Sequence, residues 1–540
     1  MSLISTAALI AIAATTTTAL AGAPYVKSAK QITDEEGRVQ VIIDFANDAH
    51  LKYPDKITVL PRTKQDGEDK PIEFFHNPKT EALVADFEKA YGLERTGMTS
   101  WVGNSVTAFL TPEQVTRIQD DARVKTIFDD VADRFSGDPT PQPSGSPGTA
   151  IWGDTVGAET TSWGHQAVNG KVRTVSNNRK VYIIDSGVAE HYDLNINNAA
   201  RLNVACGAYN CNAGNPNMYP VVGCYAHATH VAGIIGADAN SMGSRGVYAR
   251  ANMVSLSVLS RTGTALCADY GGDPANTPDT PVYRSRIGNA LDYIYWDTLY
   301  NNSSQWVNIV NISINSGGLS IDSGGPQVNW ARVKKVATPA LESVYVGCPP
   351  PQSECTYEES HQDYYYAGAF VAQSAGNQDS DYTCSLSSTG NSVARQYASK
   401  HYIPSASADS SAYADPNDGI MVVGAINKYG NRPTTFTTST GITPAVADGG
   451  SNYGVCVDIW APGDEIISTW GDPAIFGTVV GTTYSNTASL SGTSMAAPHV
   501  AAAAAYYADT YNLTTPSQIE QKIRVSRNST FTTFDLLRLQ

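Results

Sequence analysis

Short apolar runs separated by stretches with helical periodicity dominate the chain from about residue 150 onward. The runs are rich in β-branched residues and lie at 181–184, 254–259, 307–312, 369–373 and 420–425. Runs of this length without polar alternation are typical of parallel strands that are buried on both faces. Between two of them, Ile287, Ala290, Leu291 and Ile294 recur at helical spacing. The pattern therefore predicts an α/β fold in which helices cover both faces of a doubly wound parallel sheet.

A different pattern precedes this part, over residues 24–133, where charged residues are dense and cysteine is absent. Strands are expected at 39–43, 105–110 and 124–128, and a helix at 81–91. Thr111, Pro112 and Gln114 predict the start of a further helix, because they supply an N-cap, a first helical residue and a capping box. We expect a small separate α+β unit of the ferredoxin-like kind.

The first residues have the pattern of a targeting segment. Residues 3–14 are almost all apolar, and Ala19-Leu20-Ala21 offers the small side chains of a signal-peptidase site. A membrane anchor is the alternative, but the apolar segment is shorter than the roughly 20 residues that a span needs. We therefore interpret residues 1–21 as a signal peptide and expect a secreted, extracellular protein without a membrane anchor.

A segment without apolar pattern joins the two parts. Residues 136–148 are rich in Pro, Gly and Ser, a composition typical of exposed linkers that proteases cut easily. We expect residues 134–150 to be such a linker, cleaved between about 135 and 150, with the main domain running from 151 to 540.

Charge and cysteine content narrow the function classes. The formal net charge is −15 and no basic run is present, which argues against a nucleic-acid partner. All eight cysteines lie after residue 200, and an even number on a secretory route suggests disulfides, with Cys206–Cys211 and Cys348–Cys355 as short-loop candidates. Sequons permit glycans at Asn301, Asn302, Asn311, Asn512 and Asn528, although Asn311 falls in a predicted buried strand.

Residues able to do nucleophilic chemistry lie where predicted strands end or helices begin. Asp185 directly follows the first apolar run, His227 begins a helix-compatible stretch, and Asn377 lies beyond the run at 369–373. Ser494 is framed by Gly492, Thr493 and small residues, as suits an exposed nucleophile at the start of a helix. A serine hydroxyl needs a base to take its proton, and the base needs a third group to fix its tautomer.

Each of these residues also has an ordinary structural interpretation. Asp185 could form only a turn, and Asn377 could cap a turn or helix. Ser494 could be a simple N-cap. His227 and His230 could suggest a metal pair, but metal-binding histidines on a helix are usually four apart with a glutamate between them, and none is present here.

Four blocks in one order nevertheless resemble the subtilisin-type serine proteases, the subtilase family. They are Asp185-Ser186-Gly187, the stretch 227–233, Ser374-Ala375-Gly376-Asn377 and the stretch 492–498. The Asp, His, Ser order is that of the family. The resemblance implies Asp185, His227 and Ser494 as catalytic residues, with Asn377 and the backbone N–H of Ser494 as the oxyanion hole. The chain departs from the family at Ala228, where glycine is usual, and alanine is tolerable there if φ is negative.

The resemblance also implies the partners. Residues 24–133 resemble the family's inhibitor-like propeptide, carried by Tyr91-Gly92 and the stretch 110–115, with a permanent accessory domain as the alternative. An extended polypeptide substrate would contact Ser316, Gly317 and Gly318, a segment two residues longer than usual. Its remaining contacts would be Ser374, Ala375 and Gly376. No cofactor is required, calcium is a candidate without an assigned ligand set, and we expect a monomer.

Three functions follow from this sequence. The first is a secreted serine endopeptidase that works through an acyl-enzyme and matures by propeptide removal. The second is a catalytically silent relative that acts in binding or adhesion. The third is a lipase-like esterase, for which G-x-S-x-G would be expected, and Gly492-Thr493-Ser494-Met495-Ala496 lacks the final glycine.

Overall fold

A computed structural model of the 540-residue chain describes most of both predicted parts. The residues that it describes are 22–27, 31, 33–53, 56–57, 64–65, 68–69, 74–130, 132–133, 159, 161–185, 187–188, 191, 193–196, 202–203, 226–241, 243–258, 282–300, 306–314, 328–346, 360–377, 417–436, 449–454, 457–469, 487–526 and 537–539. The signal peptide, the linker and all eight cysteines lie outside these ranges, so the predictions on cleavage and disulfides stay predictions.

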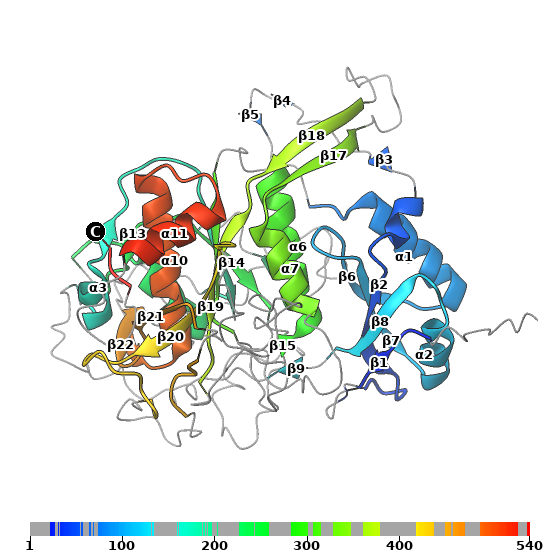
Figure 1. Ribbon diagram of the computed structural model, residues 1–540, viewed down its shortest axis with the longest axis horizontal. Helices are drawn as coiled ribbons and strands as arrows, with labels where there is room; N and C mark the ends of the chain where they lie inside the picture. The colour runs from blue at the N-terminus through cyan, green and yellow to red at the C-terminus, as the bar shows by residue number, and fades with distance from the viewer. Residues whose placement is uncertain are drawn as a thin grey trace, which may run out of the picture.

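A five-stranded sheet with two helices forms the N-terminal unit (residues 22–133), drawn blue to cyan in Figure 1. Its sheet order is β1-β8-β2-β7-β6. The strands are β1 (Tyr25–Val26), β2 (Val39–Phe45), β6 (Arg95–Thr99), β7 (Ser105–Leu110) and β8 (Val124–Asp129). The helices are α1 (Pro78–Tyr91), α2 (Pro112–Gln119) and the 3-10 turn η1 (Ala49–Lys52). The strands of this sheet and the two α-helices follow one another along the chain, from β2 to β8, as β-α-β-β-α-β. This order confirms the expected ferredoxin-like unit.

Local signals set the helix starts of this unit. The capping box at Thr111 is present, with Gln114 N donating to Thr111 Oγ1 at 3.2 Å and Thr111 N donating to Gln114 Oε1 at 3.0 Å. Helix α1 begins three residues before the predicted start, because Asn77 accepts from Lys79 N and Pro78 occupies the first turn. Strands β1 and β6, which no sequence pattern predicted, complete the two edges of the sheet.

A seven-stranded parallel sheet forms the centre of the main part, in the order β12-β14-β11-β16-β19-β20-β21. Its strands are β11 (Val181–Asp185), β12 (Leu202–Asn203), β14 (Met253–Ser257), β16 (Asn308–Ile312), β19 (Ala369–Ser374), β20 (Ile420–Ile426) and β21 (Ile459–Pro462). All five predicted apolar runs are strands of this sheet, which confirms the doubly wound α/β fold.

Helices bury both faces of the sheet. Val181 and Ile183 pack in one core with helices α5 and α10, whereas Tyr182 and Ile184 pack in a second core with α6 and α7. The helices are α3 (Trp163–Val168), α5 (Ala226–Gly236), α6 (Arg284–Tyr300), α7 (Val328–Ala337), α10 (Thr493–Thr510) and α11 (Pro516–Ser526). The small side chains at 501–505 are all buried, so α10 lies close against the sheet as the sequence predicts.

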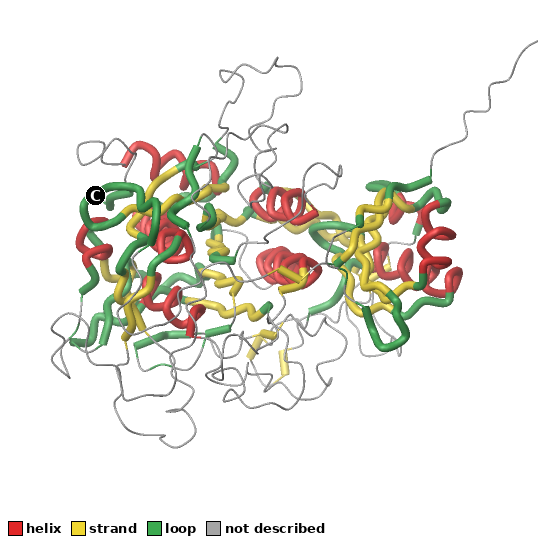
Figure 2. Tube along the Cα trace, turned by 90° about the horizontal axis from the view of Figure 1, so that it is seen from below, coloured by secondary structure: helices red, strands yellow, loops and turns green. Residues whose placement is uncertain are grey.

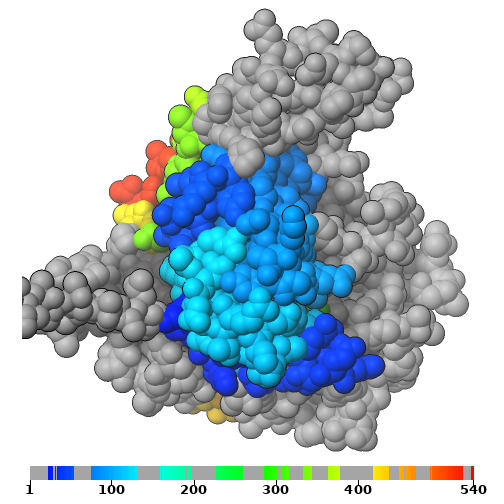
Figure 3. All heavy atoms as spheres, turned by 90° about the vertical axis from the view of Figure 1, so that its right-hand side faces the viewer, coloured from blue at the N-terminus to red at the C-terminus, as the bar shows by residue number. Residues whose placement is uncertain are grey.

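Helices α6 and α7 stand between the two sheets. Figures 1 and 2 show them in the middle of the molecule, with the N-terminal unit on their outer side. Figure 3 shows that unit filling much of the corresponding face. The two parts also share strand pairs, because β9 (Ala132–Asp133) pairs with β15 (Val282–Tyr283), and β3 (Lys56–Ile57) pairs with β17 (Ala340–Val346).

Small sheets complete the described structure. Strand β17 pairs in antiparallel fashion with β18 (Ser360–Tyr366), and the two form a hairpin. The remaining pairs are β10 (Lys171–Val172) with β13 (Tyr248–Ala249), β22 (Ile466–Thr469) with β23 (Thr487–Leu490), and β4 (Lys64–Gln65) with β5 (Glu68–Asp69). Among the described helices, none has the length and apolar character needed to cross a membrane.

Candidate active site

The end of β11 and the first turn of α5 bring a carboxylate and an imidazole together. Asp185 is the last residue of β11, and His227 is the second residue of α5. His227 Nδ1 lies 2.9 Å from Asp185 Oδ1 and 3.1 Å from Oδ2, and both side chains are buried. Because a carboxylate only accepts, this contact places the proton on Nδ1 and leaves Nε2 as the basic nitrogen. The pair therefore has the tautomer that a general base requires.

Ser494 is the second residue of α10 and is bonded to a neighbouring strand end. Its Oγ donates to the carbonyl oxygen of Ser313 at 2.8 Å, and Ser313 Oγ donates to the carbonyl oxygen of Ser494 at 2.9 Å. Asn311 Nδ2 donates in turn to Ser313 Oγ at 2.9 Å. The single hydroxyl hydrogen of Ser494 thus points to the chain beyond β16 and not to an imidazole nitrogen. This hydrogen bond to Ser313 O must break before the proton can pass to His227.

Asn377 is held by the residue that precedes the serine. Its Oδ1 accepts from Thr493 N at 2.9 Å and from Thr493 Oγ1 at 2.8 Å. Two donors at one end of the amide identify that end as oxygen, so the other end is the NH₂ group. A Cβ atom added at Gly492 would lie 3.1 Å from Asn377 Nδ2, and Gly492 has φ +153°. The NH₂ group therefore lies beside the segment that carries Ser494.

Contacts that the sequence did not predict hold the loop with Asn377. Gly376 N donates to Thr493 Oγ1 at 2.9 Å. Asn452 donates from its backbone N to Gly376 O and from Nδ2 to Ala375 O, both at 2.9 Å. The position of Thr493 next to Ser494 was a signal that could have identified it as a residue of the site. Asn452 lies in no recognised motif, so the sequence offered no such signal for it. Together these residues fix both ends of the amide-bearing turn.

The predicted substrate-binding residues divide into two sets. Ser316, Gly317 and Gly318 lie outside the described residues. Ser374 is buried, and its Oγ donates to Ile312 O at 3.4 Å. Ala375 N donates to Val423 O at 3.0 Å, so the backbone N–H and C=O groups of Ala375 and of Gly376 are bonded within the chain. The role of all six residues in substrate binding stays a prediction.

The second histidine of α5 faces a different element. His230 Nε2 lies 3.0 Å from the carbonyl oxygen of Ile466, and Ser468 Oγ donates to His230 O at 2.7 Å. Ala228 is buried inside α5 and is not among the described residues with positive φ. Alanine at this position is therefore free of the strain that a left-handed conformation would cause.

No metal centre accompanies these residues in the described structure. Within the described ranges, no three or more His, Cys, Asp or Glu side chains gather closely enough to hold an ion. Calcium remains an expectation without assigned ligands.

Comparisons with known proteins find a family model and several similar proteins. A model described as Subtilase family matches residues 176–535. The "Extracellular serine proteinase" of Thermus sp. is 39% identical over 113 residues, which cover 19% of this chain and 25% of that protein. The "Thermostable alkaline protease" of Halalkalibacterium halodurans is 26% identical over 370 residues, 68% of each chain. Fervidolysin from Fervidobacterium pennivorans, a solved structure, is 14% identical with a TM-score of 0.48, covering 96% of this chain and 62% of that one.

Proposed function

The chain belongs to the subtilase family, and from this premise we propose that it is a secreted serine endopeptidase made as a precursor. The contact between His227 Nδ1 and Asp185 Oδ1, at 2.9 Å, is the observation that carries the proposal. It joins two residues 42 positions apart in the chain in the tautomer that activates a serine. The names of the relatives support proteolysis and an extracellular location.

The proposed reaction uses the side chains already described. His227 Nε2 takes the proton of Ser494 Oγ while the oxygen attacks the peptide carbonyl, and Asp185 stabilises the imidazolium that forms. Asn377 Nδ2 and the backbone N–H of Ser494 donate to the oxyanion. His227 then returns the proton to the leaving amine, which gives an acyl-enzyme. Water deprotonated by His227 attacks the ester, and Ser494 is restored as the acid product leaves.

The bond between Ser494 and Ser313 supports a latent precursor form. Passing the proton to His227 requires the loss of this hydrogen bond, which contributes about 1 kcal/mol. Ser494 is also only 1% exposed, which supports a form whose nucleophile is covered. We propose that maturation breaks the bond to Ser313 and uncovers Ser494.

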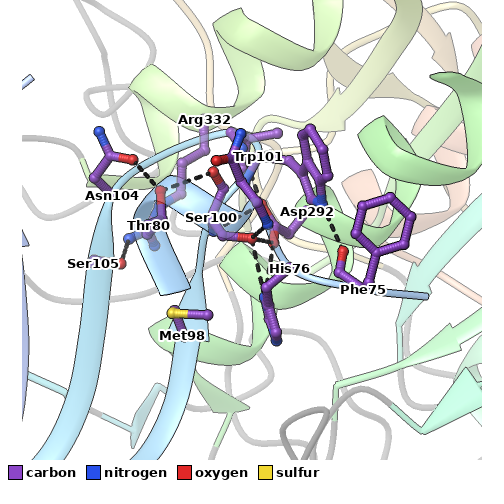
Figure 4. A network of polar contacts seen from close by, with 12 residues as sticks. Phe75, His76, Thr80, Met98, Ser100, Trp101, Asn104, Ser105, Asp292 and Arg332 are labelled. Carbon is purple, nitrogen blue, oxygen red and sulfur yellow. Dashed lines mark hydrogen bonds and ion pairs between the residues drawn. The ribbon is translucent and has the colours of Figure 1, made fainter. Parts of the chain in front are cut away.

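The N-terminal unit is the proposed inhibitor. The Asp292 carboxylate of α6 is buried and accepts hydrogen bonds from the backbone N–H groups of Ser100, Trp101 and Val102, at 2.5 to 3.1 Å (Figure 4). It also accepts from Ser100 Oγ at 3.0 Å. In a second contact, Asp130 of the N-terminal unit accepts hydrogen bonds from Ser285 N and Ser285 Oγ at the start of α6. These charge-assisted bonds support a docked unit, and we propose that cleavage between about 135 and 150 allows its removal.

A serine-directed fluorophosphonate tests the catalytic proposal. The secreted wild-type protein is expected to be labelled and to hydrolyse casein, and Ser494→Ala is expected to do neither. N-terminal sequencing of the mature protein is expected to begin between about 135 and 150, and a start near residue 24 would contradict the precursor proposal. Hydrolysis of an ester substrate without casein would instead favour the esterase.

A silent binding protein is the second candidate. The hydrogen bond from Ser494 Oγ to Ser313 O favours it, because a serine held this way is not activated. This candidate predicts no labelling even after the N-terminal unit has been removed. Labelling that appears only after removal distinguishes a latent enzyme from it.

A further inference from the structure

The N-terminal unit also inserts two adjacent phenylalanines into an aromatic surface of the main part. This surface, the aromatic seat, consists of Tyr293, Trp296 and Tyr300 on α6 and Tyr364 on β18. Phe74 lies with its ring centroid 5.3 Å from that of Trp296 and 6.1 Å from that of Tyr293. Phe75 lies 6.0 Å from Trp296 and 5.2 Å from Tyr300. Edge-on and tilted ring contacts at these distances are favourable.

The seat is built by the main part alone. Tyr293, Trp296 and Tyr300 share one side of α6 because they are three, four and seven residues apart. Tyr364 lies 4.9 Å from Tyr300 between ring centroids. The hairpin is tied to α6 and α7 by Tyr295, which donates to Glu342, and by Tyr366 Oη, which donates to Val336 O at 2.6 Å. Loss of the N-terminal unit therefore leaves the seat assembled and removes its present occupant.

A strand edge lies next to the seat. In the sheet order β18-β17-β3, strand β17 is central and β3 of the N-terminal unit occupies its outer edge, pairing at Tyr345 with Lys56 (Figure 1). Glu342 of β17 pairs with Tyr364, a residue of the seat. Three residues of strand, roughly 10 Å, separate this pair from Tyr345 along β17, and Tyr364 lies on β18, across β17 from β3. Because β3 runs parallel to β17, the N-terminal end of a strand in its place is the end nearer Glu342 and Tyr364. An extended peptide of six to eight residues with its aromatic residues at this end can thus pair with β17 and reach the seat.

The indole nitrogen of Trp296 is a polar atom of the seat that has no hydrogen-bond partner among the described residues. Trp296 is 2% exposed, and among the described residues its Nε1 is a buried indole donor without a hydrogen-bond acceptor. Leaving such a donor unmet costs about 1–3 kcal/mol. The phenylalanines that now cover the seat do not satisfy it. A peptide that brings a carbonyl or hydroxyl oxygen to Trp296 Nε1 would form a hydrogen bond that Phe74 and Phe75 do not provide.

We propose that the aromatic seat and the edge of β17 form a second binding site, apart from the catalytic residues, for an extended polypeptide segment with two adjacent aromatic residues. The inference rests on the proposed function in that removal of the N-terminal unit opens the site. The ligand is the substrate polypeptide, bound through main-chain pairing and aromatic contacts. Residues 56–57 and 74–75 occupy this site in the precursor, together with Trp101, whose ring centroid lies 5.7 Å from that of Tyr300.

A binding measurement in the full chain tests the site without any self-cleavage. The opened chain carries Ser494→Ala together with Phe74→Ala and Phe75→Ala, which remove the two phenylalanine rings from the seat. A further variant adds Trp296→Ala, which removes the aromatic ring that both phenylalanines contact. The probes are a labelled Thr-Val strand peptide that begins with Phe-Phe and the same peptide beginning with Ala-Ala. Because β3 still pairs with β17 in these chains, this measurement tests the aromatic contacts of the site. Leu51→Ala, at an exposed position of the N-terminal unit, replaces the phenylalanine changes in the control chain.

The expected result is selective binding to the opened seat. The Phe-Phe peptide should bind the opened chain at least 10-fold more tightly than the Ala-Ala peptide, since each aromatic contact contributes about 0.5–1.5 kcal/mol. The Leu51→Ala chain and the Trp296→Ala chain should bind it at least 10-fold more weakly. Equal binding of the Phe-Phe and Ala-Ala peptides, or binding that survives Trp296→Ala, overturns the proposal.

A second measurement covers the case in which the opened variant does not fold. A recognition sequence for a site-specific protease is placed within 136–148 of the Ser494→Ala chain, which keeps both phenylalanines. After cutting, excess Phe-Phe peptide should increase the release of the N-terminal unit at least several-fold over Ala-Ala peptide, and equal release overturns the proposal. Absence of self-cleavage in the wild-type chain would contradict the proposed function and leave both measurements valid.

Discussion

The hydroxyl of Thr493 is expected to control activity although it takes no part in the chemistry. It donates to Asn377 Oδ1 at 2.8 Å and accepts from Gly376 N at 2.9 Å, and the residue is fully buried. Thr493→Val keeps the size and the β-branch but removes both bonds. Asn377 Oδ1 then keeps the bond from the backbone N of Thr493, at 2.9 Å, but loses the bond from the hydroxyl. The amide is freed to tilt away from the position where the oxyanion forms.

The magnitude follows from the bonds that are lost. Gly376 N–H would stay buried without an acceptor, which costs about 1–3 kcal/mol of folding stability. Complete loss of an oxyanion donor lowers kcat by about 10²–10³, a value measured on an asparagine of subtilisin, which belongs to the same family. A displaced but present amide should cost less. We expect kcat to fall about 10- to 100-fold with KM little changed, because the bond to the oxyanion exists only in the transition state.

Steady-state kinetics on a peptide substrate measures the predicted fall in kcat, with Thr493→Ser as the matched control. Serine keeps the hydroxyl and should retain kcat within a few-fold of wild type. The double variant Thr493→Val with Asn377→Ala should be no slower than Asn377→Ala alone, since both changes act through one amide. Unchanged kcat in Thr493→Val, or equal loss in Thr493→Ser, would refute the reasoning.

Three further predictions test other parts of the structure. Gly492→Ala should slow fluorophosphonate labelling at least 10-fold, because the added Cβ meets Asn377 Nδ2 at 3.1 Å and φ is +153°; an unchanged labelling rate would show that the contact is harmless. In the uncleaved Ser494→Ala chain, Asp292→Asn should raise hydrogen exchange at residues 100–102 at least 10-fold, since an amide NH₂ replaces one of the carboxylate oxygens that now accept from backbone N–H groups; unchanged protection would contradict the docking role. Burial lowers the pKa of His499 from 6.5 to about 4. Between pH 6.5 and pH 4 the His499 side chain therefore binds a proton in the unfolded chain but not in the folded chain. The free energy of unfolding should fall by on the order of 3 kcal/mol as the pH drops from 6.5 to 4. His499→Asn in the Ser494→Ala background should flatten this dependence in denaturant titrations, and parallel curves for the two chains would exclude His499 as its cause.

The sequence predicted the elements whose signals are local. The apolar runs became the strands of the main sheet, and the capping box at Thr111 formed as expected. Strand β6, Arg95–Thr99, was not predicted because its residues RTGMT show no alternation, and its place at the sheet edge depends on pairing with β7. The β17–β18 hairpin was not predicted either, because each strand depends on pairing with the other.

The candidate site shows where local signals end. Asp185, His227, Asn377 and Ser494 could be named because each has a recognisable sequence block, and the first two do meet. The contacts of Asn452 and Ser313 with the site join residues 77 and 181 positions apart, and no spacing rule connects them. The direction of the Ser494 hydroxyl is a still finer property, because it depends on a single hydrogen bond to Ser313 O that contributes about 1 kcal/mol. The burial of Ser494 adds a second restraint that no sequence pattern indicates. Labelling before and after removal of the N-terminal unit therefore measures directly whether this chain is active or latent.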